Sequence, residues 1–214
     1  MAAHYVGWMA APATRPTVTV YFDFICPFCY LGGLRLRRLQ ERWGFDLCWE
    51  GIQIHPETPR EGAPIARFGE DLLRRAAGGI VTLAEEEGVE LNLPLTLANS
   101  GLAHRMAELA RREGCLGAYL EQVFAACFQE GRNIGDGETV PAIVRGLGIS
   151  RTAIGRFLDD RDGFTRLITA RLRAVSEGGF RGFPAVVMGQ QSWQGVQPAE
   201  VWEAGLEAVG ACPV

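Results

Sequence analysis

A segment with the alternation of a β-strand, residues 17–24, runs directly into the tetrapeptide Cys26-Pro27-Phe28-Cys29. Apolar side chains alternate with polar ones over this segment, which is the period of a strand. A helical pattern follows over residues 26–43, and Pro27 suits its first turn because the N–H group that proline lacks would have no partner there. Two thiols at the junction of a strand and a helix indicate redox chemistry in an α/β unit.

Cys26 falls at the N-terminus of this expected helix. Unpaired N–H groups and the helix dipole favour an anion at such a position. A thiolate is that anion, and it is also the reactive form of cysteine. The interior of the same helix holds Gly32 and Gly33, each of which weakens it by about 1 kcal/mol relative to alanine.

Composition narrows the class of protein. The chain has 214 residues, 48% of them hydrophobic, and a net charge of −4, which argues against a nucleic-acid partner. All 21 basic residues are arginine, so no lysine can act as a Schiff base or general base. No run is long enough to span a bilayer, and residues 1–16 lack the pattern of a secretory signal, so we expect a cytoplasmic protein. Structural disulfides are uncommon there, which favours a catalytic or metal-binding role for Cys26 and Cys29.

Strand patterns occur at both ends of the chain and helical patterns between them. We expect further strands at 46–54, 185–188 and 192–195 and a final helix at 198–209. Helical periodicity dominates residues 68–178, where Ser150 is a plausible N-cap. The outer pieces predict one small α/β unit with an inserted helical domain. We assign residues 1–16 to an N-terminal extension, 17–64 and 179–214 to the discontinuous α/β domain, and 65–178 to the insertion.

Zinc is the first alternative for the thiol pair. A structural zinc site needs four ligands, usually from two paired motifs. The remaining thiols and histidines are scattered: Cys48, Cys115, Cys127, Cys212, His4, His55 and His104. We therefore favour redox catalysis over a zinc site or a structural disulfide. Cys127 lies on an apolar helical stripe and is interpreted as a core thiol.

Asp23 and the Phe183-Pro184 pair are the other informative positions. Asp23 could relay protons by accepting one as the second thiol ionises, or it could be the solvated end of a strand. Phe183-Pro184 follows a run of glycines and precedes the late hairpin, where a cis peptide bond is possible. His104 begins a helix and could line a cleft or be an ordinary core or surface histidine.

Five segments, in the same order along the chain, resemble the DsbA family of thioredoxin-fold proteins, specifically its FrnE-like subgroup. They are residues 22–32, 99–105, 130–134, 182–184 and 195–198, and the resemblance covers residues 18–208. It implies an α/β thioredoxin fold interrupted by an all-helical domain, with a substrate cleft between the two. It also implies a thiol–disulfide oxidoreductase or isomerase in which Cys26 attacks, Cys29 resolves the mixed disulfide, and Pro184 is cis.

Two positions depart from the family pattern. Phe28 stands where tryptophan is usual, and Phe183 replaces a small or β-branched residue before the cis-proline. We expect both rings to form an apolar lip around the thiols. The predicted substrate-binding residues are Pro27, Phe28, Phe183, Pro184, Asn99 and His104.

Related families leave a second reading open. Kappa-class glutathione transferases and 2-hydroxychromene-2-carboxylate isomerases are similar in fold but place serine at the first motif position and carry a Gly-x-Asp-Arg-like loop. Cys26 and the Gly195-Val196-Gln197 loop favour dithiol chemistry over a glutathione-dependent isomerase or transferase. We expect a protein or small-molecule disulfide or dithiol as substrate, glutathione as a possible redox partner, no other cofactor and no metal, no membrane partner, and a possible homodimer. Oxidation, reduction and isomerisation are all compatible with the motif, and Cys212 could trap mixed disulfides.

Overall fold

The computed structural model describes residues 15–214, apart from the side chain of Arg161. The predicted N-terminal extension, residues 1–16, lies outside this range except for Arg15 and Pro16. In chain order the elements are β1 (Thr17–Phe22), α1 (Pro27–Arg42), β2 (Asp46–Gly51), β3 (Ala63–Pro64), the 3-10 helix η1 (Ile65–Phe68), α2 (Glu70–Glu87), β4 (Thr96–Leu97), α3 (Gly101–Arg112), α4 (Leu116–Phe128), α5 (Thr139–Gly146), α6 (Arg151–Asp159), α7 (Arg161–Glu177), β5 (Ala185–Met188), β6 (Gln191–Gln194) and α8 (Ala199–Ala208).

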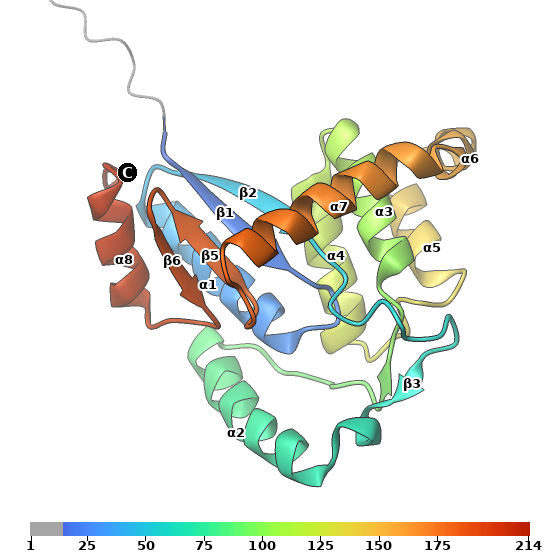
Figure 1. The fold of residues 1–214 in the computed structure, drawn as a ribbon, viewed down its shortest axis with the longest axis horizontal. Helices are drawn as coiled ribbons and strands as arrows, with labels where there is room; N and C mark the ends of the chain where they lie inside the picture. The colour runs from blue at the N-terminus through green and yellow to red at the C-terminus, as the bar shows by residue number, and fades with distance from the viewer. Residues whose placement is uncertain (1–14) are drawn as a thin grey trace, which may run out of the picture.

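The central sheet joins the two ends of the chain. Its strand order is β2-β1-β5-β6, with β1 and β2 parallel and the other neighbours antiparallel. Helix α1 lies behind the sheet and contacts α8, which lies to the left of the sheet in Figure 1, and α7 crosses in front of the sheet near β2. Helices α3, α4, α5 and α6 pack together at one side, while α2 lies apart from them along the lower edge of the molecule (Figure 1). An α/β unit with inserted helices is therefore observed, as predicted.

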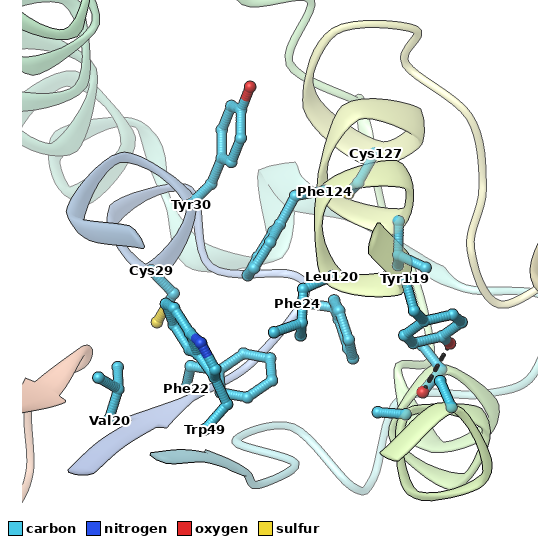
Figure 2. Packing of buried hydrophobic residues seen from close by; sticks show 14 of the residues in the cluster. Val20, Phe22, Phe24, Cys29, Tyr30, Trp49, Tyr119, Leu120, Phe124 and Cys127 are labelled. Atoms are coloured by element: carbon cyan, nitrogen blue, oxygen red, sulfur yellow. Dashed lines mark hydrogen bonds between the residues drawn. The ribbon is translucent and has the colours of Figure 1, made fainter. Parts of the chain in front are cut away.

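A continuous apolar core links the sheet to the inserted helices. Phe22, the last residue of β1, and Phe24, just after the strand, lie with their rings 5.9 and 5.2 Å from the ring of Phe124 on α4. Phe124 also stacks on Tyr30 of α1 at 5.5 Å, and Figure 2 shows the Phe124 ring between those of Tyr30 and Phe24. Aromatic pairs at these separations add to the stability gained from burial. The inserted helices are thus packed directly on the strand that leads into the thiol pair.

Close packing explains the glycines inside α1. A Cβ atom on Gly32 would lie 3.0 Å from Cγ of Pro184, and one on Gly33 would lie 3.2 Å from the Trp49 ring. Real Cβ contacts are rarely this short, so these positions accept little more than a hydrogen atom. The two glycines lower the helical propensity of α1. Because they have no side chain, α1 can approach both the Phe183–Pro184 loop and β2.

A largely buried ion-pair network also fixes α1. Arg35 is 7% exposed, and its Nε donates to Oε1 of Glu87 over 2.7 Å. Its Nη2 donates to Glu86 over 2.5 Å, and its Nη1 donates to the carbonyl oxygen of Gln197 over 2.7 Å. Arg38 contacts the other oxygen of Glu87. These bonds tie α1 to the end of α2 and to the loop after β6.

The main differences from the sequence prediction are in strand length. The first strand ends at Phe22 and the second at Gly51, each earlier than expected, because the chain turns there and Ile54 N–H donates to the Asp23 carboxylate over 2.7 Å. Ser150 caps α6 as predicted, with its Oγ accepting from the N–H of Ala153. Within residues 15–214, no helix combines the length and the apolar character needed to cross a membrane.

Candidate active site

The two motif thiols occupy different environments at the start of α1. Cys26 is the N-cap residue, with an extended backbone, and Pro27 takes the first helical position. The carbonyl of Cys26 accepts from the N–H groups of Cys29 and Tyr30 over 3.0 and 3.2 Å. Both cysteines are free thiols; Cys26 is 8% exposed and Cys29 is fully buried. This pairing suits a mechanism in which Cys26 reacts with the substrate first and the enclosed Cys29 reacts afterwards.

Burial raises the pKa of the Cys29 thiol well above its ordinary value, because a thiolate would lose its hydration there. A hydrogen bond with Cys26 and the charge of Cys26 raise it further. A hydrogen bond from the backbone of Asp23 favours the Cys29 thiolate, while the charge of the Asp23 carboxylate disfavours it. Cys29 is therefore held as a protonated thiol.

The Phe183–Pro184 loop lies against Cys26. The Phe183–Pro184 peptide bond is cis, and Cys26 Sγ lies 3.8 Å from the Phe183 carbonyl oxygen, although 157 positions separate the two residues in sequence. Oε1 of Gln194 accepts from the N–H of Gly182 over 2.8 Å, and the Pro184 carbonyl accepts from the N–H of Gly195 over 2.9 Å. The β6 strand and the loop that follows it thus hold this segment in place beside the thiol.

An apolar pocket of about 430 Å³ opens beside the motif. Ile25, Pro27 and Phe28 form the wall nearest the thiols, and the rest of the wall comes from η1, α2, the segment 93–98, the end of α4 and Arg132. Of the described residues that line the pocket, Arg132 is the one with a charged side chain, and Phe183 is not among them. The size and apolar character are those of a site that encloses a small molecule or a hydrophobic side chain.

Sequence reasoning missed most of this pocket. It missed the apolar face that α2 turns toward Phe28, and it did not place Cys127 or Arg132 there. The helical spacing of the apolar residues on α2 could have signalled the wall. The wall residues on this helix are Leu72, Leu73, Ala76, Ala77 and Ile80.

Asp23 is buried behind the thiols and is fully enclosed, so the interpretation as a solvated strand end is wrong. Its Oδ2 accepts from Ile54 N–H over 2.7 Å, and its Oδ1 lies 3.0 Å from Nε2 of His104 and 3.4 Å from Ile25 N. His104 comes from α3 and is 1% exposed. The structure thus joins two residues that the sequence singled out separately, and it turns His104 toward Asp23.

Asn99 organises the loop before α3. Its Oδ1 accepts from Gln53 Nε2 over 3.0 Å and from Gly101 N–H over 2.9 Å, and its Nδ2 donates to the carbonyl of Thr58 over 2.5 Å. Both the oxygen and the nitrogen of the Asn99 amide therefore form hydrogen bonds with other groups of the chain. Substrate binding by Asn99 stays a prediction.

The other thiols differ from the motif pair. Cys127 is 1% exposed, and burial together with the charge of Asp23 raises its pKa to about 12. Burial and the neighbouring Glu50 carboxylate raise the pKa of Cys48. Cys212 is exposed near the end of the chain. Among the residues that the structure describes, no three His, Cys, Asp or Glu side chains form a group suited to a metal ion; His4 lies outside the described range.

Comparison with known proteins gives one consistent family. Residues 17–207 match the model of the DSBA-like thioredoxin domain. The chain is 30% identical over 205 residues to a 2-hydroxychromene-2-carboxylate isomerase of Pseudomonas sp. (strain C18), with 92% of each chain covered.

Two solved structures have the same fold. A probable DsbA oxidoreductase from Streptomyces coelicolor has a TM-score of 0.80 at 21% identity, covering 91% of this chain and 90% of that one. The cytosolic disulfide reductase DsbM from Pseudomonas aeruginosa, in a structure with GSH, has a TM-score of 0.67 at 19% identity, covering 90% and 98%. The predicted DsbA-like thioredoxin fold is confirmed, and the chain belongs to the family of DSBA-like thioredoxin domains.

Proposed function

We propose that this protein is a thiol–disulfide oxidoreductase that uses Cys26 as nucleophile and Cys29 as resolving thiol. The observation that carries the proposal is the pair of thiols at the start of α1. Cys26 is partly accessible and faces the Phe183 carbonyl, and Cys29 is fully buried. Cys26 stands at the start of α1 with its Sγ 3.8 Å from the Phe183 carbonyl oxygen, and burial, which raises the pKa of Cys29, keeps that second thiol protonated until it attacks. Membership of a DsbA-like family supports the same class of reaction.

The reaction follows from this arrangement. The Cys26 thiolate attacks one sulfur of a substrate disulfide, and the other substrate sulfur leaves as a thiolate. Cys29 then gives its proton to the Asp23 carboxylate and attacks Sγ of Cys26, which breaks the mixed disulfide and releases the second substrate thiolate. The substrate disulfide is reduced, and the enzyme dithiol is oxidised to a Cys26–Cys29 disulfide. The same steps run backwards when the enzyme oxidises a dithiol.

The apolar pocket indicates what such a substrate carries. Pro27 and Phe28 bring its wall next to Cys26, so an apolar group attached to the reacting sulfur would be buried there. Phe183 and Pro184 would contribute backbone on the other side of the thiol. We propose glutathione as the redox partner that restores the dithiol, since the related DsbM structure was solved with GSH. The cytoplasm stays our prediction for where this happens.

A glutathione-dependent isomerase is the second candidate. It is favoured by 30% identity to a 2-hydroxychromene-2-carboxylate isomerase over almost the whole chain, together with a pocket large enough for a small aromatic acid. In that case Cys26 would stand near bound glutathione without forming a disulfide with Cys29. Tight glutathione binding that survives Cys26→Ser would favour this candidate.

Turnover of insulin disulfides tests the main proposal. Activity should disappear in Cys26→Ser and fall strongly in Cys29→Ser. Cys212→Ser is the matched control, because it removes an exposed thiol away from the motif and should retain full activity. If Cys26→Ser and Cys29→Ser both turn over insulin like the wild type, the redox assignment is wrong.

A further inference from the structure

We propose that His104, contributed by the inserted helices, is a positioning residue that holds Asp23 as a carboxylate and thereby sets the pH range in which Cys29 resolves the mixed disulfide. The inference rests on the proposed function and adds to it a second buried residue from outside the α/β unit. Neither residue needs to touch the substrate.

The hydrogen bonds of Asp23 are the first support. The carboxylate is fully buried, so an ionised form needs donors to replace water. Ile54 N–H supplies one over 2.7 Å, whereas Ile25 N–H is long at 3.4 Å. Among the side chains that the structure describes, that of His104 donates to the Asp23 carboxylate over 3.0 Å. His104 is therefore the second strong donor on which the charged form depends.

The surroundings of His104 fix which of its nitrogens donates. Its Nδ1 is buried and has no hydrogen-bond partner among residues 15–214, and it is packed so closely against Gly51 that a Cβ atom there would clash with it. A proton on Nδ1 would be a buried donor without an acceptor, which is costly. The neutral ring with its proton on Nε2 avoids that cost and points the N–H bond at Asp23. The rings of Phe22 and Phe24 enclose the imidazole at 5.7 and 5.0 Å.

The position of Asp23 relative to Cys29 is the second support. The Asp23 carbonyl accepts from the Cys26 N–H over 3.1 Å, so the aspartate belongs to the same turn as the motif. Its carboxylate is also close enough for its charge to raise the pKa of both Cys29 and Cys127. A carboxylate at this site disfavours a standing thiolate on Cys29 and is able to accept the proton when Cys29 attacks.

Other ionisable groups around the pair are accounted for. On the Gly51 side, Arg171 of α7 donates to the Gly51 carbonyl over 3.3 Å and pairs with Glu50 of β2 and Glu108 of α3. On the α4 side are Cys127, whose pKa of about 12 keeps it neutral, and Tyr119, whose hydroxyl donates to the Ala103 carbonyl over 2.8 Å. From α1 the groups are Cys26 and Cys29 themselves. The arginine is thus committed to two other carboxylates.

A two-phase reaction with an aromatic disulfide tests the inference. The reduced protein is mixed with 5,5′-dithiobis(2-nitrobenzoate), which releases one coloured thiolate when Cys26 is modified and a second when Cys29 resolves the mixed disulfide. The parent protein carries serine at Cys48, Cys115 and Cys212, so that these more accessible thiols do not contribute. The rate of the second release is measured across pH in the parent and in each variant.

Removing the His104 donor should change the pH profile of the second thiolate release and leave that of the first release unchanged. His104→Leu should shift its pH profile upward by about one to two units, the effect of losing a hydrogen bond to a charged group. Asp23→Asn should slow the second phase by about 100-fold or more, because the proton acceptor is lost. His104→Gln, whose amide reaches toward the Nε2 position, should restore a profile near that of the parent, and His104→Asn, which is too short, should not.

His55→Leu is the matched control. It removes the half-buried histidine that contacts Glu57 over 3.1 Å, and it should leave both phases unchanged. If the second-phase profile of folded His104→Leu or His104→Asn coincides with that of the parent, the inference is overturned. If the parent itself shows no release from Cys26, the proposed function fails instead, so the two failures are distinguishable.

Discussion

Replacing Gly32 with alanine is a direct perturbation of the composite site. Gly32 lies within α1, where it packs against the loop that carries the cis-proline. An added Cβ would lie 3.0 Å from Pro184 Cγ, 3.3 Å from Val196 Cγ2 and 3.6 Å from the Trp202 ring. The nearest neighbour belongs to a stiff ring, so either α1 or the loop has to move.

Two opposing effects set the magnitude. Alanine gains about 1 kcal/mol in helix propensity over glycine. Overpacking of a well-packed site costs about 1–3 kcal/mol. We therefore expect Gly32→Ala to lower the free energy of unfolding by about 1 kcal/mol. Because the loop also carries the Phe183 carbonyl that faces Cys26, we expect insulin turnover to fall as well.

Gly78→Ala is the matched control, since Gly78 lies inside α2 and an added Cβ meets nothing within 4 Å. It should raise the free energy of unfolding by about 1 kcal/mol and leave turnover unchanged. Urea titration and the insulin assay measure the two quantities on the same preparations. The reasoning is refuted if Gly32→Ala stabilises the protein as much as Gly78→Ala does and retains full turnover.

Three further predictions concern ion pairs, thiols and the pocket. Arg35→Met should cost about 1.5–3 kcal/mol in urea titrations, because the buried Glu87 loses one of its two cations and keeps Arg38. Arg37→Met, at an exposed ion pair, should cost less than about 1 kcal/mol, and equal costs for the two variants would contradict the burial argument. Burial raises the pKa of Cys29, so alkylation of Cys29 should be slower than that of Cys212 at neutral pH and should accelerate as the pH rises toward that pKa. Peptide mass spectrometry measures both alkylation rates, and equal rates would contradict the prediction. Phe28→Ala should lower kcat/KM for an aromatic disulfide by about tenfold and affect glutathione disulfide much less; an equal loss for both would argue against substrate contact in the pocket.

The sequence predicts the α/β unit well because its signals are local. Alternation identifies β1, a short apolar run identifies β5, and Pro198 correctly marks where α8 begins. The Gly-Phe-Pro segment and the thiol motif were linked through a family resemblance rather than through spacing, and their proximity is a property of strand order. β5 pairs with β1, which brings the end of the chain beside its beginning.

The pocket and the buried pair could not be predicted in this way. The contact between Asp23 and His104 joins residues 81 positions apart, and neither residue type carries a local signal for it. The pocket wall depends on how α2 and the segment 93–98 settle against Phe28, which is decided by packing between elements. The early end of β1 has the same origin, because Asp23 bonds to Ile54 instead of continuing the strand.

The most direct test of the central claim is a redox titration of the reduced protein against glutathione buffers, with the Cys26 and Cys29 thiols counted by mass spectrometry. The proposed function predicts a two-electron transition to a Cys26–Cys29 disulfide, with a stable glutathione adduct on Cys26 only in Cys29→Ser. A wild-type protein that stays a dithiol in oxidising buffers, or that accumulates the Cys26 adduct, would contradict it.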